Sequence, residues 1–250
     1  MTGLTDLVPT LIGVGALVAI TIAVLWGSHT PHRFAPALAI LRGAAQLAVI
    51  SVILSGVITS PLWVTVALLV MFSVAAVTAT RRLHWSWIHF RLVATAMAAG
   101  ILVTLLIVFS TGAVEFTPRY ALAIGGIVIG NAMSIATLAG RRLTESVNDR
   151  WDEVEGWAAL GATPRQSTLW LARDAVYSAL IPATDQTKTT GLVTLPGAFV
   201  GALFGGASPL EAAQFQLVVL AGLALAMTTT GLIVTRLAGR TPYVGIGAPD

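Results

Sequence analysis

Long apolar stretches separated by short polar segments run along almost the whole chain. A membrane-spanning helix needs about 20 mostly apolar residues, and this criterion predicts about seven spans, the sixth interrupted by polar residues and proline. Their approximate bounds are 8–26, 35–57, 62–79, 92–109, 120–139, 178–204 and 214–237. The short alternating strands of a membrane barrel do not occur. The pattern therefore predicts an all-α membrane protein in which residues 1–250 form a single transmembrane domain.

One polar segment, residues 141–175, stands out because it is dense in Asp, Glu and Arg. We call it the elbow. Val147, Trp151, Val154 and Ala158 recur at helical spacing, which predicts one amphipathic helix through these positions. Since so polar a segment cannot cross a bilayer, we expect it to lie on the membrane surface.

A second elbow helix is predicted to follow directly. Gly161 suits the left-handed position that ends a helix. Thr163 then reads as an N-cap, with Pro164 at the first helical position and Gln166 completing a capping box. The elbow is either an ordinary solvated connector or a docking site for a soluble partner that pushes on the membrane helices.

Composition and charge support the membrane interpretation and orient the chain. Hydrophobic residues make up 56% and charged residues 10%, and the mean hydropathy is +0.86. A net charge of +3 could suggest nucleic acid, but the basic residues flank apolar spans, so membrane lipids are the expected partners and nucleic acid is not. The loops after the first, third and fifth spans hold most of the arginines, whereas the opposite loops hold only Arg119. The positive-inside rule then places the N-terminus outside, and the elbow and C-terminus in the cytoplasm, for a protein of the cytoplasmic membrane.

Polar groups inside the predicted spans are candidates for a transport pathway, because such groups are costly in hydrocarbon unless they face protein or water. Snorkelling explains an arginine here equally well, and an interhelical hydrogen bond explains an asparagine. A helix break before Gly197 is also predicted, and unwound backbone is tolerated where it lines a cavity. The candidate pathway residues are Arg42, Gln46, Asn131, Asp185, Gln186, Lys188, Pro196 and Gly197.

Asp185 and Lys188 lie three residues apart, within pairing reach on a helix. The spacing of Gly197, Gly201 and Gly205, and of Gly126 and Gly130, lets helix backbones approach closely in lipid. Such approach serves either packing within the chain or a seam between two copies.

Motifs for catalysis are missing from the sequence. The chain has no Cys, no HExxH arrangement of its four His, and no phosphate-binding Gly-x-x-x-x-Gly-Lys loop. We therefore expect no catalytic residues and no cofactor bound by this chain, and any ATP hydrolysis must come from another subunit.

Several sequence blocks resemble a known family. Residues 155–164 (EGWAALGATP) resemble the Glu-Ala-Ala…Gly coupling loop of ABC importer permeases. The chain from about 35 to 237 is similar to the Fet-type iron-export permeases, a family that includes a plant aluminium-tolerance membrane subunit. The similarity lies in the blocks 130–133 (GNAM), 161–164 (GATP), 180–182 (LIP), 191–197 (GLVTLPG) and 208–212 (SPLEA).

This resemblance implies a permease that pairs with a separate cytoplasmic ATP-binding cassette ATPase, two of each, and exports iron or another metal. It implies that the elbow contacts the ATPase through Glu153, Glu155, Trp157, Gly161, Thr163, Pro164 and Arg165. Some positions that are rich in methionine in bacterial members of the family are occupied here by Thr187, Lys188, Ala198 and Phe199. This difference leaves the substrate class open. Two alternatives also stay open: an ion-driven secondary transporter or channel without an ATPase, and a membrane sensor or assembly subunit that transports nothing.

Overall fold

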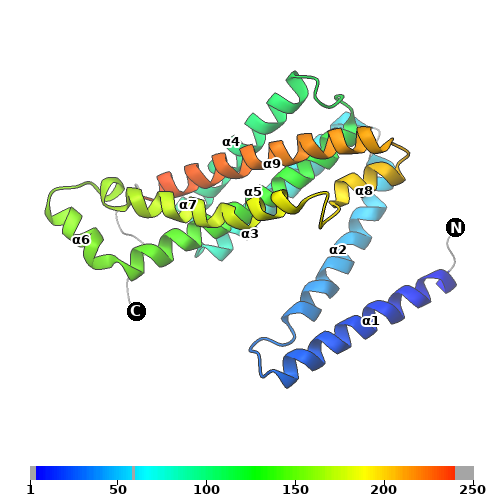
Figure 1. Cartoon of the computed structure of the whole chain (residues 1–250), viewed down its shortest axis with the longest axis horizontal. Helices are drawn as coiled ribbons and strands as arrows, with labels where there is room; N and C mark the ends of the chain where they lie inside the picture. Colours follow the sequence, from blue (N-terminus) through cyan, green and yellow to red (C-terminus); the bar gives the residue numbers. More distant parts are fainter. Residues whose placement is uncertain (1–3, 58–59, 240–250) are drawn as a thin grey trace. The chain divides into compact units, whose positions relative to one another are not determined.

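The structure is a computed structural model that describes residues 4–57 and 60–239, with side chains for residues 8–51 and 60–239. Both chain ends, which were predicted to lie on opposite sides of the membrane, fall at least partly outside the described residues. Within the described ranges the regular secondary structure is helical, apart from an isolated bridge between Thr190 and Thr194, and short turns connect the helices. The helices are α1 (Leu4–Gly27), α2 (Ala35–Val57), α3 (Pro61–Arg82), α4 (Trp87–Ser110), α5 (Pro118–Asp149), α6 (Trp151–Ala159), α7 (Pro164–Thr189), α8 (Gly197–Phe204) and α9 (Pro209–Ala238) (Figure 1).

The chain divides into two compact units, and each is described by itself. The first unit holds α1 and α2, which contact each other. Its large apolar side chains, such as Leu11, Leu17 and Leu41, are mostly exposed. Exposed apolar faces on long, mostly apolar helices are typical of segments that meet lipid.

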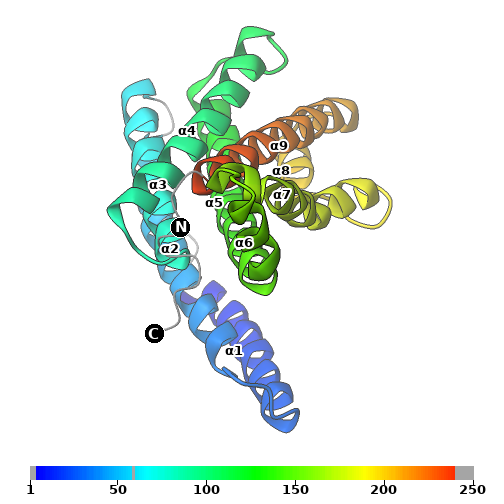
Figure 2. The same cartoon turned by 90° about the vertical axis from the view of Figure 1, so that its left-hand side faces the viewer.

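The second unit holds α3 to α9. Helix α5 lies at its centre and contacts α3, α4, α7 and α9 (Figure 2). The main core forms where α3, α4, α5 and α9 meet and is rich in small residues, among them the fully buried Ala96, Ala132 and Ala226. Small side chains allow membrane helices to approach closely, so packing contacts rather than large apolar volume hold this bundle together.

The tightest approach is between α4 and α9, at Gly100. A Cβ atom at this position would lie 2.7 Å from the carbonyl oxygen of Ala226, which is backbone and cannot move aside. At Gly130, by contrast, a Cβ atom would have no neighbour within 4 Å in the described part of the chain. The two glycines therefore form a matched pair for a stability test.

We expect Gly100→Val to destabilise the protein by about 1–3 kcal/mol, the typical result of overpacking. The Tm in detergent should then fall by roughly 3–10 °C. Gly130→Val, with the same change in helix propensity, should leave the Tm nearly unchanged. Equal Tm values for the two variants would contradict this account of the α4–α9 contact.

The prediction of an all-α membrane protein is confirmed. Among the described residues, five helices are long and apolar enough to cross a membrane, by length and composition: α1, α3, α4, α5 and α9. Residues Ala35–Ser51 of α2 form a shorter apolar helix. The sixth predicted span, 178–204, is not one helix but comprises the end of α7, a non-helical segment and α8.

Two local predictions need correction. One amphipathic helix through residues 147–158 was predicted, but α5 ends at Asp149 and α6 begins at Trp151. Arg150 between them has φ −124° and ψ 35°, outside the helical region. A helix break was predicted at Leu195–Gly197, but α7 already ends at Thr189 and helix resumes only at Gly197. Pro182 lies inside α7 without ending it.

Candidate functional site

The elbow is formed by the end of α5, by α6 and by the start of α7. A small apolar cluster holds these three segments together: Leu143 and Val147 from α5, Val154 from α6, and Leu171, Ala172 and Ala175 from α7. Val147 of α5 and Val154 of α6 are fully buried, whereas Trp151 is 38% exposed. Because α6 is anchored on both long helices, a force on α6 is transmitted to α5 and α7.

The turn into α7 has the predicted geometry. Gly161 has φ +86°, in the left-handed region. The Thr163 hydroxyl accepts a hydrogen bond from the Gln166 amide at 3.4 Å, and the Gln166 Oε1 accepts one from the Thr163 amide at 2.8 Å. The predicted capping box is therefore confirmed, and it fixes the direction in which α7 leaves the elbow.

We expect Thr163→Ala to weaken the first turn of α7 by about 1 kcal/mol, because the N-cap hydroxyl is lost. Amide hydrogen exchange in residues 165–168 should then speed up by roughly fivefold. The control is Thr189→Ala, because the Thr189 hydroxyl donates only to carbonyls of its own helix. This substitution should leave hydrogen exchange in the first turn of α7 unchanged. Unchanged exchange in Thr163→Ala would show that the cap contributes no local stability.

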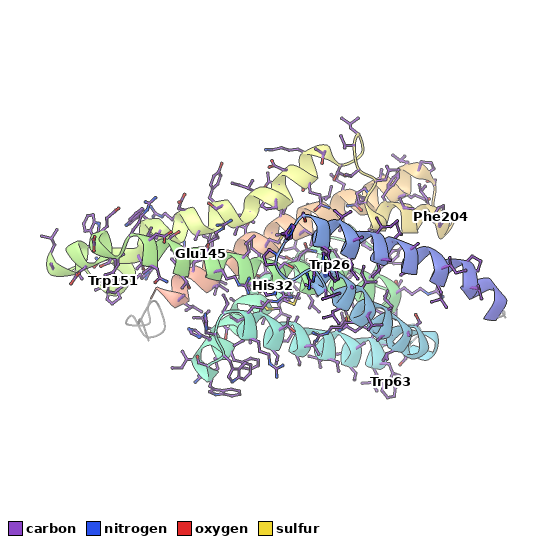
Figure 3. The ribbon with its side chains drawn as sticks, turned by 90° about the horizontal axis from the view of Figure 1, so that it is seen from below. Trp26, His32, Trp63, Glu145, Trp151 and Phe204 are labelled. Atoms are coloured by element: carbon purple, nitrogen blue, oxygen red, sulfur yellow. The ribbon has the colours of Figure 1, made fainter. Side chains whose placement is uncertain are left out.

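The surface of the elbow presents the residues that were expected to contact a partner. Glu153, Glu155, Trp157, Gly161, Thr163 and Arg165 are exposed, and Pro164 is half-buried. Trp157 is 52% exposed, and the neighbouring Leu160, which the sequence analysis did not single out, is 83% exposed. Aromatic and apolar side chains ringed by charges are typical of a protein-binding surface. The elbow, which includes Glu145 and Trp151, lies at one end of the second unit (Figure 3). Phe204 lies at the opposite end (Figure 3).

The second unit also contains a cavity of about 650 Å³ between α5, α7, α8 and α9. Four of the candidate pathway residues line it: Asn131, Gln186, Pro196 and Gly197. Threonines 184, 187, 190 and 228 contribute hydroxyl groups. The volume lies within the range of small-molecule binding sites. We call this the α7–α9 cavity.

Gln216 of α9 also lines the α7–α9 cavity, and the sequence analysis missed it. Its side chain is 6% exposed, and its Oε1 atom has no hydrogen-bond partner in the described part of the chain. A buried polar atom without a partner is unfavourable, so such an atom at a cavity wall indicates a missing ligand or water. The signal was present in the sequence, since Gln216 is a polar residue within an apolar helix, as Asn131 is.

The other candidate pathway residues lie elsewhere. Asp185 and Lys188 form the expected ion pair, with Oδ1 and Nζ 3.0 Å apart, but the pair is exposed and does not line the cavity. Arg42 and Gln46 belong to the first unit, whereas the cavity is built from residues of the second.

The lining of the α7–α9 cavity is mostly apolar, and its polar groups are uncharged amides and hydroxyls. The Asn131 amide donates to the carbonyl of Ile127 at 2.9 Å, which fixes the side chain and leaves its oxygen as an acceptor. Charged side chains are not among the lining residues. Within residues 8–51 and 60–239, three or more His, Cys, Asp or Glu side chains do not gather as metal ligands. The cavity can therefore hold a solute through hydrogen bonds from amide and hydroxyl groups.

Comparison with known proteins identifies relatives along nearly the whole chain. The membrane protein STAR2 of Oryza sativa subsp. japonica is 36% identical over 232 residues, which cover 92% of this chain and 81% of STAR2. Protein ALUMINUM SENSITIVE 3 of Arabidopsis thaliana is 36% identical over 198 residues, 78% of this chain and 72% of that protein. The probable iron export permease protein FetB of Escherichia coli is 37% identical over 124 residues, 50% of this chain and 48% of FetB.

Solved structures provide no match to this chain. Residues 8–243 match the family described as "Uncharacterised protein family (UPF0014)". This match and the relatives together confirm the resemblance to the Fet-type permeases, and the chain belongs to the UPF0014 family of membrane proteins.

Proposed function

We propose that the chain is the permease subunit of an ABC transporter and is driven by a separate cytoplasmic ATPase. The observation that carries this proposal is the continuity of α7. This helix begins at the capping box of the elbow and runs unbroken to Thr189, and residues near its far end line the α7–α9 cavity. Its 26 residues correspond to a rod of roughly 39 Å. A displacement of the elbow is thereby delivered to the cavity wall.

The location proposed for the elbow is the cytoplasm. At 32 residues, α5 is roughly 48 Å long, which exceeds the roughly 30 Å of bilayer hydrocarbon. The elbow end of α5 carries Arg141, Arg142 and Glu145, so this end is the part that projects into water. We place about seven spans in the cytoplasmic membrane, with the N-terminus outside and the C-terminus in the cytoplasm, as the positive-inside rule favours.

The proposed ATPase contact consists of Glu153, Glu155, Trp157, Gly161, Thr163, Pro164 and Arg165, together with the exposed Leu160. ATP binds and is hydrolysed on the partner subunit, and this chain is not itself an enzyme. The name of one relative, the probable iron export permease protein FetB, supports the assignment of this chain as a permease.

We further propose that two permease chains assemble. At Gly197 and Gly201 of α8, an added Cβ atom would meet no described atom within 4 Å. Packing within the described part of the second unit therefore does not account for the close-approach spacing of these glycines, and a second copy of the chain would.

The proposed cargo is iron or another metal, and the proposed direction is export, on the strength of the name of FetB. The α7–α9 cavity offers amides and hydroxyls rather than carboxylates, thiolates or imidazoles. These groups hydrogen-bond to water or to organic ligands better than they replace the coordination shell of a metal ion. A metal cargo would therefore be recognised through its hydration shell or chelator. We expect these contacts to come from Asn131, Gln186 and Gln216, near the helix break marked by Pro196 and Gly197. The remaining pathway candidates are Arg42, Gln46, Asp185 and Lys188.

Co-purification followed by reconstitution tests the proposal. The tagged chain should bring down an ATP-binding cassette ATPase, and proteoliposomes with both subunits should move iron only when ATP is supplied. Iron transport by the chain alone, driven by an ion gradient, would show a secondary transporter instead. An absence of flux under every condition, despite a stable complex, would favour a sensor or assembly subunit.

A further inference from the structure

The second unit contains another cavity, of about 440 Å³, near the base of the elbow. It shares none of its lining residues with the α7–α9 cavity. Its walls come from the end of α3 and the loop after it, the start of α4, the elbow end of α5 and the end of α9. We call it the basal cavity. Three segments that are distant in sequence, within residues 82–93, 140–148 and 234–238, thus border one space.

The polar part of the basal cavity is basic. Arg82, His84, His89 and Arg141 line it, with Thr144 and Asn148 as further hydrogen-bonding groups. Among the lining residues the one acid is Glu145, and its carboxylate lies 3.3 Å from Arg142, which does not line the cavity. The acid is therefore partly neutralised from outside, and an excess of positive charge faces the cavity.

Backbone contacts hold two of these basic groups in place. The Nε of Arg141 donates to the carbonyl of Arg82 at 3.3 Å, which draws α5 and the end of α3 together. The Nδ1 of His89 lies 3.0 Å from the carbonyl of His84. Because a carbonyl only accepts, Nδ1 carries the proton, and the imidazole ring is oriented by this bond. Fixed basic groups lose less conformational entropy on binding an anion than free side chains do.

The remaining walls are apolar, and aromatic side chains stand beside the cavity. Leu83, Leu92, Val93 and Val234 contribute apolar surface. Trp85, in the turn between α3 and α4, is 54% exposed, and Trp87, the first residue of α4, is 65% exposed. Exposed tryptophans next to basic residues at the end of an apolar helix are typical of the headgroup layer of a membrane. The cavity therefore combines a basic rim with an apolar wall at the depth of lipid headgroups.

We propose that the basal cavity binds a phosphate group, carried by an anionic lipid headgroup or free in the cytosol. The guanidinium groups of Arg82 and Arg141 supply the planar donors that match phosphate oxygens. Basic pockets between membrane helices on the cytoplasmic side are suited to anionic headgroups. Leu143 both lines this cavity and belongs to the apolar cluster under α6. A bound phosphate group would consequently brace the base of the elbow. This inference does not depend on the proposed transport activity, but it rests on the proposed cytoplasmic location of the elbow.

Thermal unfolding of the full chain in nanodiscs tests the site. The three arms are phosphatidylcholine alone, phosphatidylcholine with phosphatidylglycerol, and phosphatidylcholine with inorganic phosphate in the buffer. Phosphatidylcholine also carries phosphate, but its ammonium group would be repelled by the arginines. A ligand that binds only the folded state raises the Tm, so we expect a rise of several degrees with phosphatidylglycerol. A comparable rise with inorganic phosphate would assign the site to free phosphate.

The variants compare arginines inside and outside the cavity. Arg82→Gln/Arg141→Gln should abolish the rise. Arg81→Gln/Arg91→Gln, which removes the same charge from neighbouring exposed positions that do not line the cavity, should retain it. Persistence of the rise in the first variant, equal loss in both variants, or no rise in either ligand arm would overturn the proposal.

A measurement on the unmodified protein covers the case in which the first variant fails to fold. Native mass spectrometry after exposure to an equimolar mixture should show phosphatidylglycerol retained several times more often than phosphatidylcholine. Equal retention of the two lipids would count against the site.

Discussion

Gly161→Glu is expected to abolish ATP-driven transport by the assembled complex while leaving membrane insertion intact. Gly161 has φ +86°, a conformation that disfavours most side chains by about 1–2 kcal/mol. Such a difference lowers the population of the native turn by a factor of roughly 5–30. The substitution also places a new carboxylate at the tip of the elbow, beside the residues proposed to contact the ATPase. The measurements are ATPase co-purification and ATP-dependent iron flux in proteoliposomes.

Gly161→Asn is the matched control, because Asn tolerates the left-handed conformation far better than most residues and carries no charge. It should retain most of the association and the flux. If Gly161→Glu associates with the ATPase and transports iron as the unmodified protein does, the elbow does not couple the two subunits.

Gln216→Leu is expected to lower transport without lowering stability. The Oε1 of Gln216 is buried without a partner in the described structure, so an apolar side chain of similar size should leave the Tm unchanged or raise it. If the same oxygen hydrogen-bonds the cargo, its loss weakens cargo binding by about 1–3 kcal/mol. The cargo concentration for half-maximal flux should then rise roughly 5–150-fold.

The control is Gln214→Leu, two residues earlier on α9. Gln214 is exposed and does not line the α7–α9 cavity, so its replacement should leave the concentration dependence of flux unchanged. A marked fall in Tm for Gln216→Leu, with unchanged flux in folded protein, would assign Gln216 a purely structural role.

The features predicted correctly from the sequence are those decided by neighbouring residues. The capping box depends on Thr163, Pro164 and Gln166, and the turn depends on Gly161, so local chemistry alone determines them. The break at Arg150 was missed because Val147, Trp151, Val154 and Ala158 keep helical spacing across it, whereas the reversal toward α7 is imposed by tertiary packing of Val147 and Val154. In such a conflict tertiary contacts override local propensity.

The candidate site was predicted in part, for a related reason. Asn131, Gln186, Pro196 and Gly197 were each selected as polar or helix-breaking positions inside apolar spans, but their convergence depends on how α5, α7 and α8 pack. Nothing local distinguishes Gln186, which lines the cavity, from Asp185, which does not. One residue along a helix is a rotation of 100°, so the orientation of α7 against its neighbours decides between them.

The unbroken course of α7 has a consequence for regulation of the proposed transporter. If α7 moves as one rigid helix between the elbow and the α7–α9 cavity, a change of conformation at one end is accompanied by a change at the other. Thermodynamic linkage then requires reciprocity: whatever factor nucleotide binding applies to cargo affinity, cargo must apply to nucleotide affinity. Cargo bound in the α7–α9 cavity would thus change the affinity of the ATPase for ATP, without a separate sensor.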